Sequence, residues 1–214
     1  MSLELRVLSV NVALPEYAGE RNGEPLFSAF RKRPVSVDSI EVRELGLAGD
    51  GQADLSVHGG PDKAVYAYPA DNWQWWEQEH RLPSSPGSFA ENLTVAGADE
   101  THIRIGDRFA WGSVLLEVSQ PRQPCHKFQR FTGREDAGAL MTLSGRTGWY
   151  FRVLTPGTAP VKLGLVRVES GSGPNIRELY LAAWDRQLSS ERRAELAQIP
   201  RLSEAWRKKF RPPS

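Results

Sequence analysis

Residues 103–118 read IRIGDRFAWGSVLLEV. This stretch has two short apolar runs, 103–109 and 114–118, and the first run contains the pair Gly106-Asp107. Gly-Asp pairs are typical of tight turns, and short apolar runs between turn residues are typical of β-strands. Pro156-Gly157 is a second such turn pair. Further runs of the same kind occur at 3–7, 10–12, 35–37, 40–42, 64–68, 150–154 and 161–168. The sequence therefore predicts a mainly β fold, an antiparallel barrel.

Two short helices are predicted to interrupt the strands. Asp71 is placed to cap the first, which carries Trp73, Trp76 and His80 on one face. The second covers residues 135–143. We interpret the tryptophans as core packing.

The Gly/Ser/Pro-rich segment 169–175 marks a boundary, because helical spacing of apolar residues begins after it. Three helical patterns follow, within 176–188, 191–199 and 202–210. We therefore expect a barrel domain over residues 1–170 and a small C-terminal three-helix module over residues 174–214. This module either covers one side of the barrel or docks a partner, and the sequence leaves both roles open.

The chain has 214 residues, a formal net charge of +1 and a single cysteine, Cys125. A charge this small creates no global field that would attract a nucleic acid polymer or a membrane surface. The N-terminus has no apolar segment typical of a signal peptide, and no stretch is long enough to span a bilayer. A lone cysteine cannot form an internal disulfide, which fits a reducing compartment. We therefore expect a cytoplasmic protein without nucleic-acid or membrane partners.

Cys125 lies in the segment SQPRQPCHK, residues 119–127. Proline fixes φ and removes a backbone donor, so this segment is predicted to be a stiff, extended loop that presents the thiol. Between residues 120 and 134 there are four basic residues and no acidic one, and nearby cations favour the reactive thiolate. A functional cysteine is our preferred interpretation, and a buried, inert cysteine is the alternative. In an extended loop His126 points to the opposite side, so a Cys125–His126 dyad is not expected.

Four motifs precede this loop: GLAGDGQAD at 46–54, VHGGPDKAVY at 57–66, FAENLT at 89–94 and IGDRF at 105–109. With the QPRQPC loop, their order and spacing resemble a MOSC domain, and within that family the YiiM-like group of small, single-chain bacterial proteins. The resemblance runs from about residue 3 to the C-terminus. Ala90 stands where the pattern has glycine before Glu-Asn-Leu.

The resemblance implies that the chain binds molybdenum cofactor, a pterin that carries a dithiolene and a phosphate. Such a ligand needs a soft donor for its metal, so Cys125 is the expected metal ligand and a catalytic residue. It also needs a positive, donor-rich pocket for the phosphate and the pterin edges. The expected members of this pocket are Gly59, Gly60, Lys63, Asn92, Arg122 and Lys127.

Two residues of the VHGGPDKAVY motif have more than one interpretation. The motif assigns His58 to the site, as a catalytic proton donor near the metal or as a pterin contact. Without the motif, we would interpret His58 as a buried histidine bonded to a carbonyl. Asp62 is assigned to the cofactor pocket, with ordering of the loop as an equal alternative. No pair among the four histidines has metal-ligand spacing, so a zinc site is not expected.

The same resemblance implies a reductase of N-hydroxylated compounds, with toxic N-hydroxylated purine bases such as 6-hydroxylaminopurine as the substrate class. The cofactor would carry the redox chemistry, while the protein orients the substrate and supplies protons. The alternative is a carrier of molybdenum cofactor or sulfur without turnover of its own. A third function, a hydrolase with Cys125 as nucleophile, needs a base that the sequence does not place.

Reduction needs two electrons, and the sequence shows no means of collecting them from a nicotinamide. Gly171 and Gly173 lack the third glycine of a dinucleotide fingerprint, and one cysteine is too few for an iron–sulfur cluster. We therefore expect a separate electron-donating reductase, a flavoprotein or a ferredoxin-type protein. Part of its predicted docking site is the C-terminal module, which has seven basic against three acidic residues from Glu191 onward.

Overall fold

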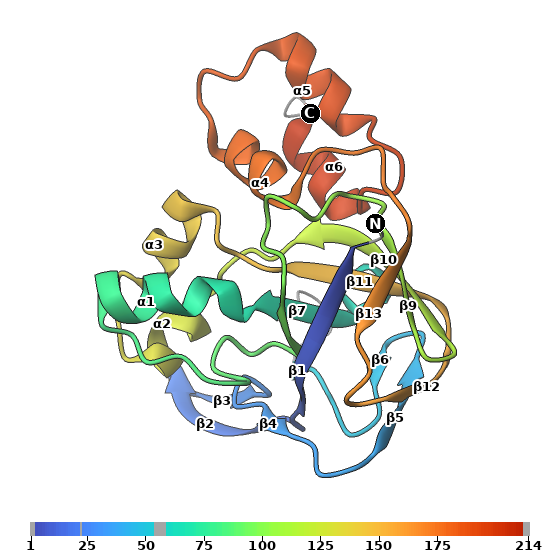
Figure 1. Cartoon of the computed structure of the whole chain (residues 1–214). Helices are drawn as coiled ribbons and strands as arrows, with labels where there is room; N and C mark the ends of the chain where they lie inside the picture. The colour runs from blue at the N-terminus through green and yellow to red at the C-terminus, as the bar shows by residue number, and fades with distance from the viewer. Residues whose placement is uncertain (1–2, 22, 54–58, 212–214) are drawn as a thin grey trace.

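Seven strands close into a β-barrel in the computed structural model, which describes residues 3–21, 23–53 and 59–211 (Figure 1). Their order around the barrel is β13-β9-β10-β11-β7-β8-β1, and pairing of β1 with β13 closes it. Neighbouring strands are antiparallel except β7 and β8, which are parallel. The barrel strands are β1 (Glu4–Val12), β7 (Val65–Pro69), β8 (Leu93–Ala96), β9 (Arg108–Trp111), β10 (Val114–Pro121), β11 (Trp149–Thr155) and β13 (Leu165–Glu169).

Smaller strands lie towards the end of the barrel away from α4 to α6 (Figure 1). The hairpin of β2 and β3 forms its own two-stranded sheet, and β12, β5 and β6 form a three-stranded sheet. A short strand, β4, pairs with the end of β1. Their bounds are β2 (Glu16–Arg21), β3 (Glu24–Ser28), β4 (Arg33–Pro34), β5 (Ser39–Arg43), β6 (Gly46–Leu47) and β12 (Gly157–Pro160).

Helices cover the barrel in two groups. One group lies beside it, and the other, α4 to α6, covers one end (Figure 1). The first group comprises η1 (Pro61–Lys63), η2 (Ala70–Asn72), α1 (Trp73–His80), α2 (His126–Thr132) and α3 (Ala137–Ser144). The second comprises α4 (Ile176–Trp184), α5 (Ser190–Ala197) and α6 (Glu204–Phe210).

The structure confirms the mainly β barrel with helical insertions and three C-terminal helices. The last barrel strand ends at Glu169 and α4 begins at Ile176, on either side of the Gly/Ser/Pro-rich segment. Apolar residues of α4 and α6, such as Leu179 and Trp206, are buried in the same hydrophobic cluster as barrel residues such as Trp149. The C-terminal helices therefore share the core of the barrel.

Several local predictions were wrong. Residues 35–37 are not a strand, and 103–107 precede β9 as a turn, although Ile103 and Ile105 are fully buried. The β2–β3 hairpin has no alternating apolar pattern and was missed. Asn72 directly precedes the helix at Trp73 but makes no side-chain capping hydrogen bond, whereas the Asp71 carboxylate accepts a hydrogen bond from Gly97 N at 3.1 Å. Short elements of this kind depend on tertiary contacts more than on local sequence.

The cysteine segment is also less extended than predicted. Residues 119–121 belong to β10, a short connection follows, and α2 begins directly after Cys125. Phe128 of α2 is fully buried in an aromatic cluster with Trp76 and Phe89. Burial of the face that carries Phe128 stabilises α2. The proline-rich sequence before α2 does not predict this helix. The side chain of His126 lies outside the described part of the structure.

Glu100 is a buried carboxyl group between η2 and the start of β11. It is 1% exposed, and it accepts hydrogen bonds from Asn72 Nδ2 at 2.9 Å and from Gly148 N at 2.7 Å. Burial outweighs these bonds and raises the pKa of Glu100 to about 7. An acid whose pKa rises on folding opposes folding once the pH exceeds its unfolded pKa.

We expect the free energy of unfolding to fall by about 3 kcal/mol through Glu100 as the pH rises from 4.5 to 7. Glu100→Gln stays neutral and should remove this part of the pH dependence, leaving the part due to other buried acids. Urea unfolding of both proteins between about pH 5 and 8 measures how steeply the free energy of unfolding changes with pH in each. The same pH dependence in both proteins would show that Glu100 does not titrate in this range.

Candidate functional site

A cavity of about 340 Å³ lies beside Cys125. Its walls come from β7, β10 and β11, from the connections around residues 28–32, 50–53 and 120–125, and from α6. Among the described residues that line it, five are basic and one is acidic, so the cavity is suited to an anionic ligand. These charged residues are Lys32, Asp50, Lys63, Arg122, Lys127 and Lys209.

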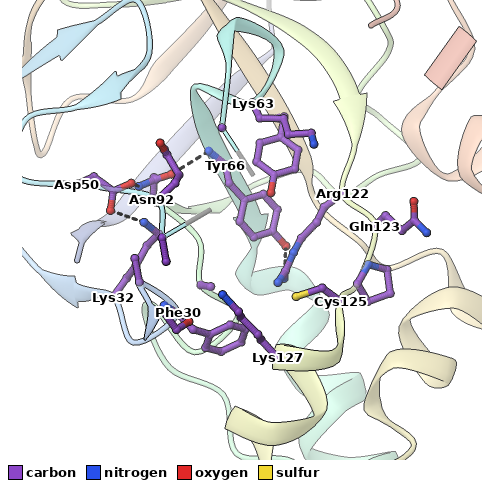
Figure 2. A pocket seen from close by; sticks show the side chains of 18 of the residues that line it. Phe30, Lys32, Asp50, Lys63, Tyr66, Asn92, Arg122, Gln123, Cys125 and Lys127 are labelled. Atoms are coloured by element: carbon purple, nitrogen blue, oxygen red, sulfur yellow. Dashed lines mark hydrogen bonds and ion pairs between the residues drawn. The ribbon is translucent and has the colours of Figure 1, made fainter. Parts of the chain in front are cut away.

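Cys125 and Arg122 face the same part of this cavity (Figure 2). Cys125 is partly exposed and precedes the first residue of α2 in an extended conformation, with φ −113° and ψ 167°. Arg122 is 5% exposed. It donates hydrogen bonds to Phe89 O at 2.7 Å and to Tyr66 Oη at 3.3 Å. The loop thus places a thiol at the cavity wall next to a fixed guanidinium.

The charge of Arg122 is held without a carboxylate ion pair in the described part of the chain. Its guanidinium carbon lies 4.8 Å from the ring centre of Tyr66 and 5.5 Å from that of Phe128, within the range of cation–π attraction. Burial disfavours the charge, but Tyr66, Tyr150 and Cys125 together raise the pKa of Arg122 above its ordinary value. Arg122 is therefore a permanent buried cation that a bound anion would complement.

Two tyrosines line the cavity that sequence reasoning did not assign. Tyr66 lies on β7 and Tyr150 on β11, with ring centres 5.1 Å apart. Burial raises the pKa of both phenols, so each remains a neutral donor at physiological pH. Tyr66 ends the VHGGPDKAVY motif, which could have identified it, but nothing near Tyr150 in the sequence signals its role. Pairing of β11 with β7 brings them together.

A buried ion pair forms the opposite wall. Lys32 Nζ contacts Asp50 Oδ1, and the side chains are 8% and 3% exposed. Asp50 also accepts hydrogen bonds from Ala13 N at 2.9 Å and from Asn92 Nδ2 at 2.9 Å. Burial lowers the pKa of Lys32, and Asp50 partly offsets this. The GLAGDGQAD motif thus contributes the acceptor that keeps Lys32 in place, although Lys32 itself was not predicted.

Asn92 and Lys127 line the cavity, but both side chains already have protein partners. Asn92 Oδ1 accepts a hydrogen bond from Tyr66 N at 3.1 Å, and its amide donates to Asp50 and to Asn11 O. Lys127 Nζ donates to Phe27 O at 3.0 Å and so attaches α2 to the β2–β3 hairpin. Their first role is to hold the walls of the cavity together.

The connection before η1 lies at the cavity edge. Gly59 and Gly60 have φ of 89° and 85°, values that favour glycine, and Gly59 and Lys63 line the cavity. Burial lowers the pKa of Lys63, and nearby Asp62 partly offsets this effect. Asp62 does not line the cavity, because its carboxylate pairs with Arg152 at 2.6 Å. The Asp62 carboxylate thus attaches η1 to β11, and His58 lies outside the described residues.

Ala90 lies in the turn that carries the Arg122 acceptor Phe89. Its φ is 62°, in the left-handed region, at the position where the family pattern has glycine. The buried carboxylate of Glu91 holds this turn by accepting from Gly87 N at 2.8 Å and Phe89 N at 3.0 Å. The turn geometry therefore persists despite the side chain at residue 90.

We expect Ala90→Gly to stabilise the fold by about 1 kcal/mol, because it removes the contact between Cβ and the backbone in the left-handed conformation. Ala110→Gly, in the middle of β9, is the matched control and should destabilise by about 0.5–1 kcal/mol. Urea unfolding measures both changes. Destabilisation by Ala90→Gly would show that residue 90 is not strained.

The sequence matches the MOSC domain family over residues 54–170, which is more than half of the chain, so the protein belongs to that family. YiiM of Escherichia coli is 33% identical over 195 residues, with 89% of this chain and 87% of YiiM covered. A reductase of Gibberella moniliformis is 37% identical over 118 residues, which cover 52% of this chain and 20% of the reductase. The crystal structure of YiiM from Geobacillus stearothermophilus superimposes with a TM-score of 0.80 at 30% identity, covering 96% and 97% of the two chains.

MOSC domains are associated with molybdenum cofactor, and the cavity fits such a ligand by its donor chemistry. Cys125 offers a soft sulfur donor, Arg122 is a buried cation without a carboxylate partner among the described residues, and Lys63 adds a second cation. The cationic wall suits a phosphate, and the aromatic side chains suit a flat pterin. None of the helices in the described residues is long and apolar enough to cross a membrane.

Proposed function

We propose that this protein is a molybdenum-cofactor-dependent reductase of N-hydroxylated compounds, with N-hydroxylated purine bases as its substrate class. The observation that carries the proposal is the partly exposed thiol of Cys125 beside the buried guanidinium of Arg122, in a cavity with five basic side chains and one acidic among its described residues. A soft sulfur donor next to a buried cation that has no carboxylate partner among the described residues suits a cofactor that carries both a metal and a negative charge. The similarity to a protein named reductase agrees with this class of reaction.

The bound cofactor would supply the two-electron redox chemistry. In the overall reaction an N-hydroxylamine, two electrons and two protons give the amine and water. Cys125 would hold the metal, while Arg122 and Lys63 would hold anionic groups of the cofactor. The neutral phenol of Tyr150, in the cavity wall, is our candidate to donate a hydrogen bond to the substrate.

Electrons would come from a separate flavoprotein or ferredoxin-type reductase. The predicted docking site on the C-terminal module is less positive than its sequence indicates, because Arg192, Arg201 and Arg211 form ion pairs with glutamates. Lys209 lines the cavity. A partner that reaches the cofactor would therefore dock around the cavity mouth, through a small and transient contact.

The test is to purify the protein from a host that makes molybdenum cofactor and to measure molybdenum, pterin and turnover of 6-hydroxylaminopurine. We expect about one molybdenum per chain, and reduction with a chemical or protein electron donor but not with NADH alone. Molybdenum without turnover would favour the carrier function instead. Absence of bound molybdenum and pterin would contradict both.

Lys63→Met is expected to weaken retention of the cofactor by at least about tenfold, because it removes one charge-assisted contact to an anion. The matched control is Lys162→Met, an exposed lysine between β12 and β13. The measurement is molybdenum and pterin content after extended dialysis. Equal retention by both variants and the parent would place the anion-binding wall elsewhere.

A further inference from the structure

The C-terminal helix α6 forms part of the cavity wall, although it lies outside the segment that matches the MOSC family. Ala205, Trp206 and Lys209 line the same cavity as Cys125. The family match ends at residue 170, and α6 begins at Glu204. The C-terminal module therefore does more than cover the barrel: it supplies side chains to the site.

Lys209 is a cation with a defined position. Its Nζ lies 5.3 Å from the ring centre of Trp184 and 5.6 Å from that of Trp206. No carboxylate lies within ion-pair distance of it in residues 3–21, 23–53 and 59–211. Burial lowers its pKa. Two aromatic faces thus hold an ammonium group at the cavity wall without neutralising it.

The position of α6 is itself fixed by contacts to β10. Ser203, which caps α6, donates its backbone N–H to Ser119 O at 3.1 Å. Ser119 Oγ in turn lies 2.6 Å from Asp62 O, in the connection that carries Lys63. Arg201 pairs with Glu169 at 2.6 Å and with Glu117 of β10 at 3.5 Å. These contacts join α6 to the two elements that supply Arg122 and Lys63.

We propose that Lys209 forms a phosphate subsite of the cavity, supplied by the C-terminal module. The ligand is a phosphate group, carried either by the cofactor or by a phosphorylated N-hydroxylated substrate, that is, a nucleotide and not only a free base. The identity of that carrier rests on the proposed function, but the subsite does not. Lys208, the preceding residue of α6, is exposed and does not line the cavity, so it offers a matched control.

The subsite is tested on cofactor-free protein by calorimetric titration with inorganic phosphate. We expect saturable binding that is at least about tenfold weaker in Lys209→Met, which keeps the apolar stem, and near the parent value in Lys209→Arg and Lys208→Met. Equal phosphate affinity of Lys209→Met and the parent, or no saturable binding by the parent, overturns the proposal. This titration involves no turnover, so it tests the subsite even if the protein does not reduce N-hydroxylated compounds.

Cofactor-loaded protein then distinguishes the two carriers. If the cofactor carries the phosphate, Lys209→Met loses pterin and molybdenum on dialysis faster than Lys208→Met. If the substrate carries it, retention is equal, but KM rises about tenfold or more for an N-hydroxylated purine nucleotide and stays unchanged for the free base. If Lys209→Met and Lys208→Met retain the cofactor equally and do not differ in KM for the nucleotide or for the free base, the subsite is overturned in the working protein.

Discussion

Replacing Cys125 by serine is expected to abolish reduction of N-hydroxylated substrates while the fold persists. The serine hydroxyl is a much harder donor than a thiolate and stays protonated at neutral pH, so it is a poor ligand for a soft metal site. Cys125 is partly exposed, so the change leaves no cavity in the core. Turnover should fall below detection, and molybdenum content should drop, whereas pterin can still bind through the cationic wall.

The matched control is Gln129→Ala, an exposed residue of α2 that does not line the cavity. It should retain the molybdenum content and the rate of the parent. Circular dichroism and urea unfolding show whether each variant keeps the fold. Full reductase activity in Cys125→Ser would remove the thiol from the mechanism, and with it the central assignment of the site.

Asp50→Ala is expected to destabilise the protein by about 3–5 kcal/mol, because it leaves the buried ammonium of Lys32 without its counterion. It also removes the acceptor of Ala13 N and one of the two acceptors of Asn92 Nδ2. Adding Lys32→Met to Asp50→Ala removes the unpaired charge, so the double variant should recover a large part of the lost stability. Urea unfolding of the parent, both single variants and the double variant gives the coupling between the two residues.

A surface ion pair provides the comparison. Arg43 and Glu41 are paired at 2.7 Å but both side chains are more than half exposed. Glu41→Ala should leave the free energy of unfolding nearly unchanged, because solvent screens an exposed pair. If Asp50→Ala were as mild as Glu41→Ala, Lys32 would have to be neutral or hydrated in the folded protein.

The sequence was sufficient to predict elements whose signal is local. Short apolar runs between turn residues predicted most of the barrel strands, and helical spacing after residue 170 predicted α4, α5 and α6. The motif order identified the family and placed Cys125, Arg122, Lys63 and Gly59 at one cavity. Motifs succeed here because a ligand needs particular residue types on a few connections, and within each connection these residues lie close together in the chain.

Tertiary structure decided the parts of the site that come from distant segments. Tyr150 reaches Tyr66 only because β11 pairs with β7, and Lys32 reaches Asp50 only because both segments pack at one end of the barrel. Lys209 appears in the sequence as one of several basic residues near the C-terminus, yet contacts of α6 with β10 turn it towards the cavity. Spacing along a helix or strand shows which residues share a face. Which face meets the cavity depends on packing between elements far apart in the chain, and no local pattern records that packing.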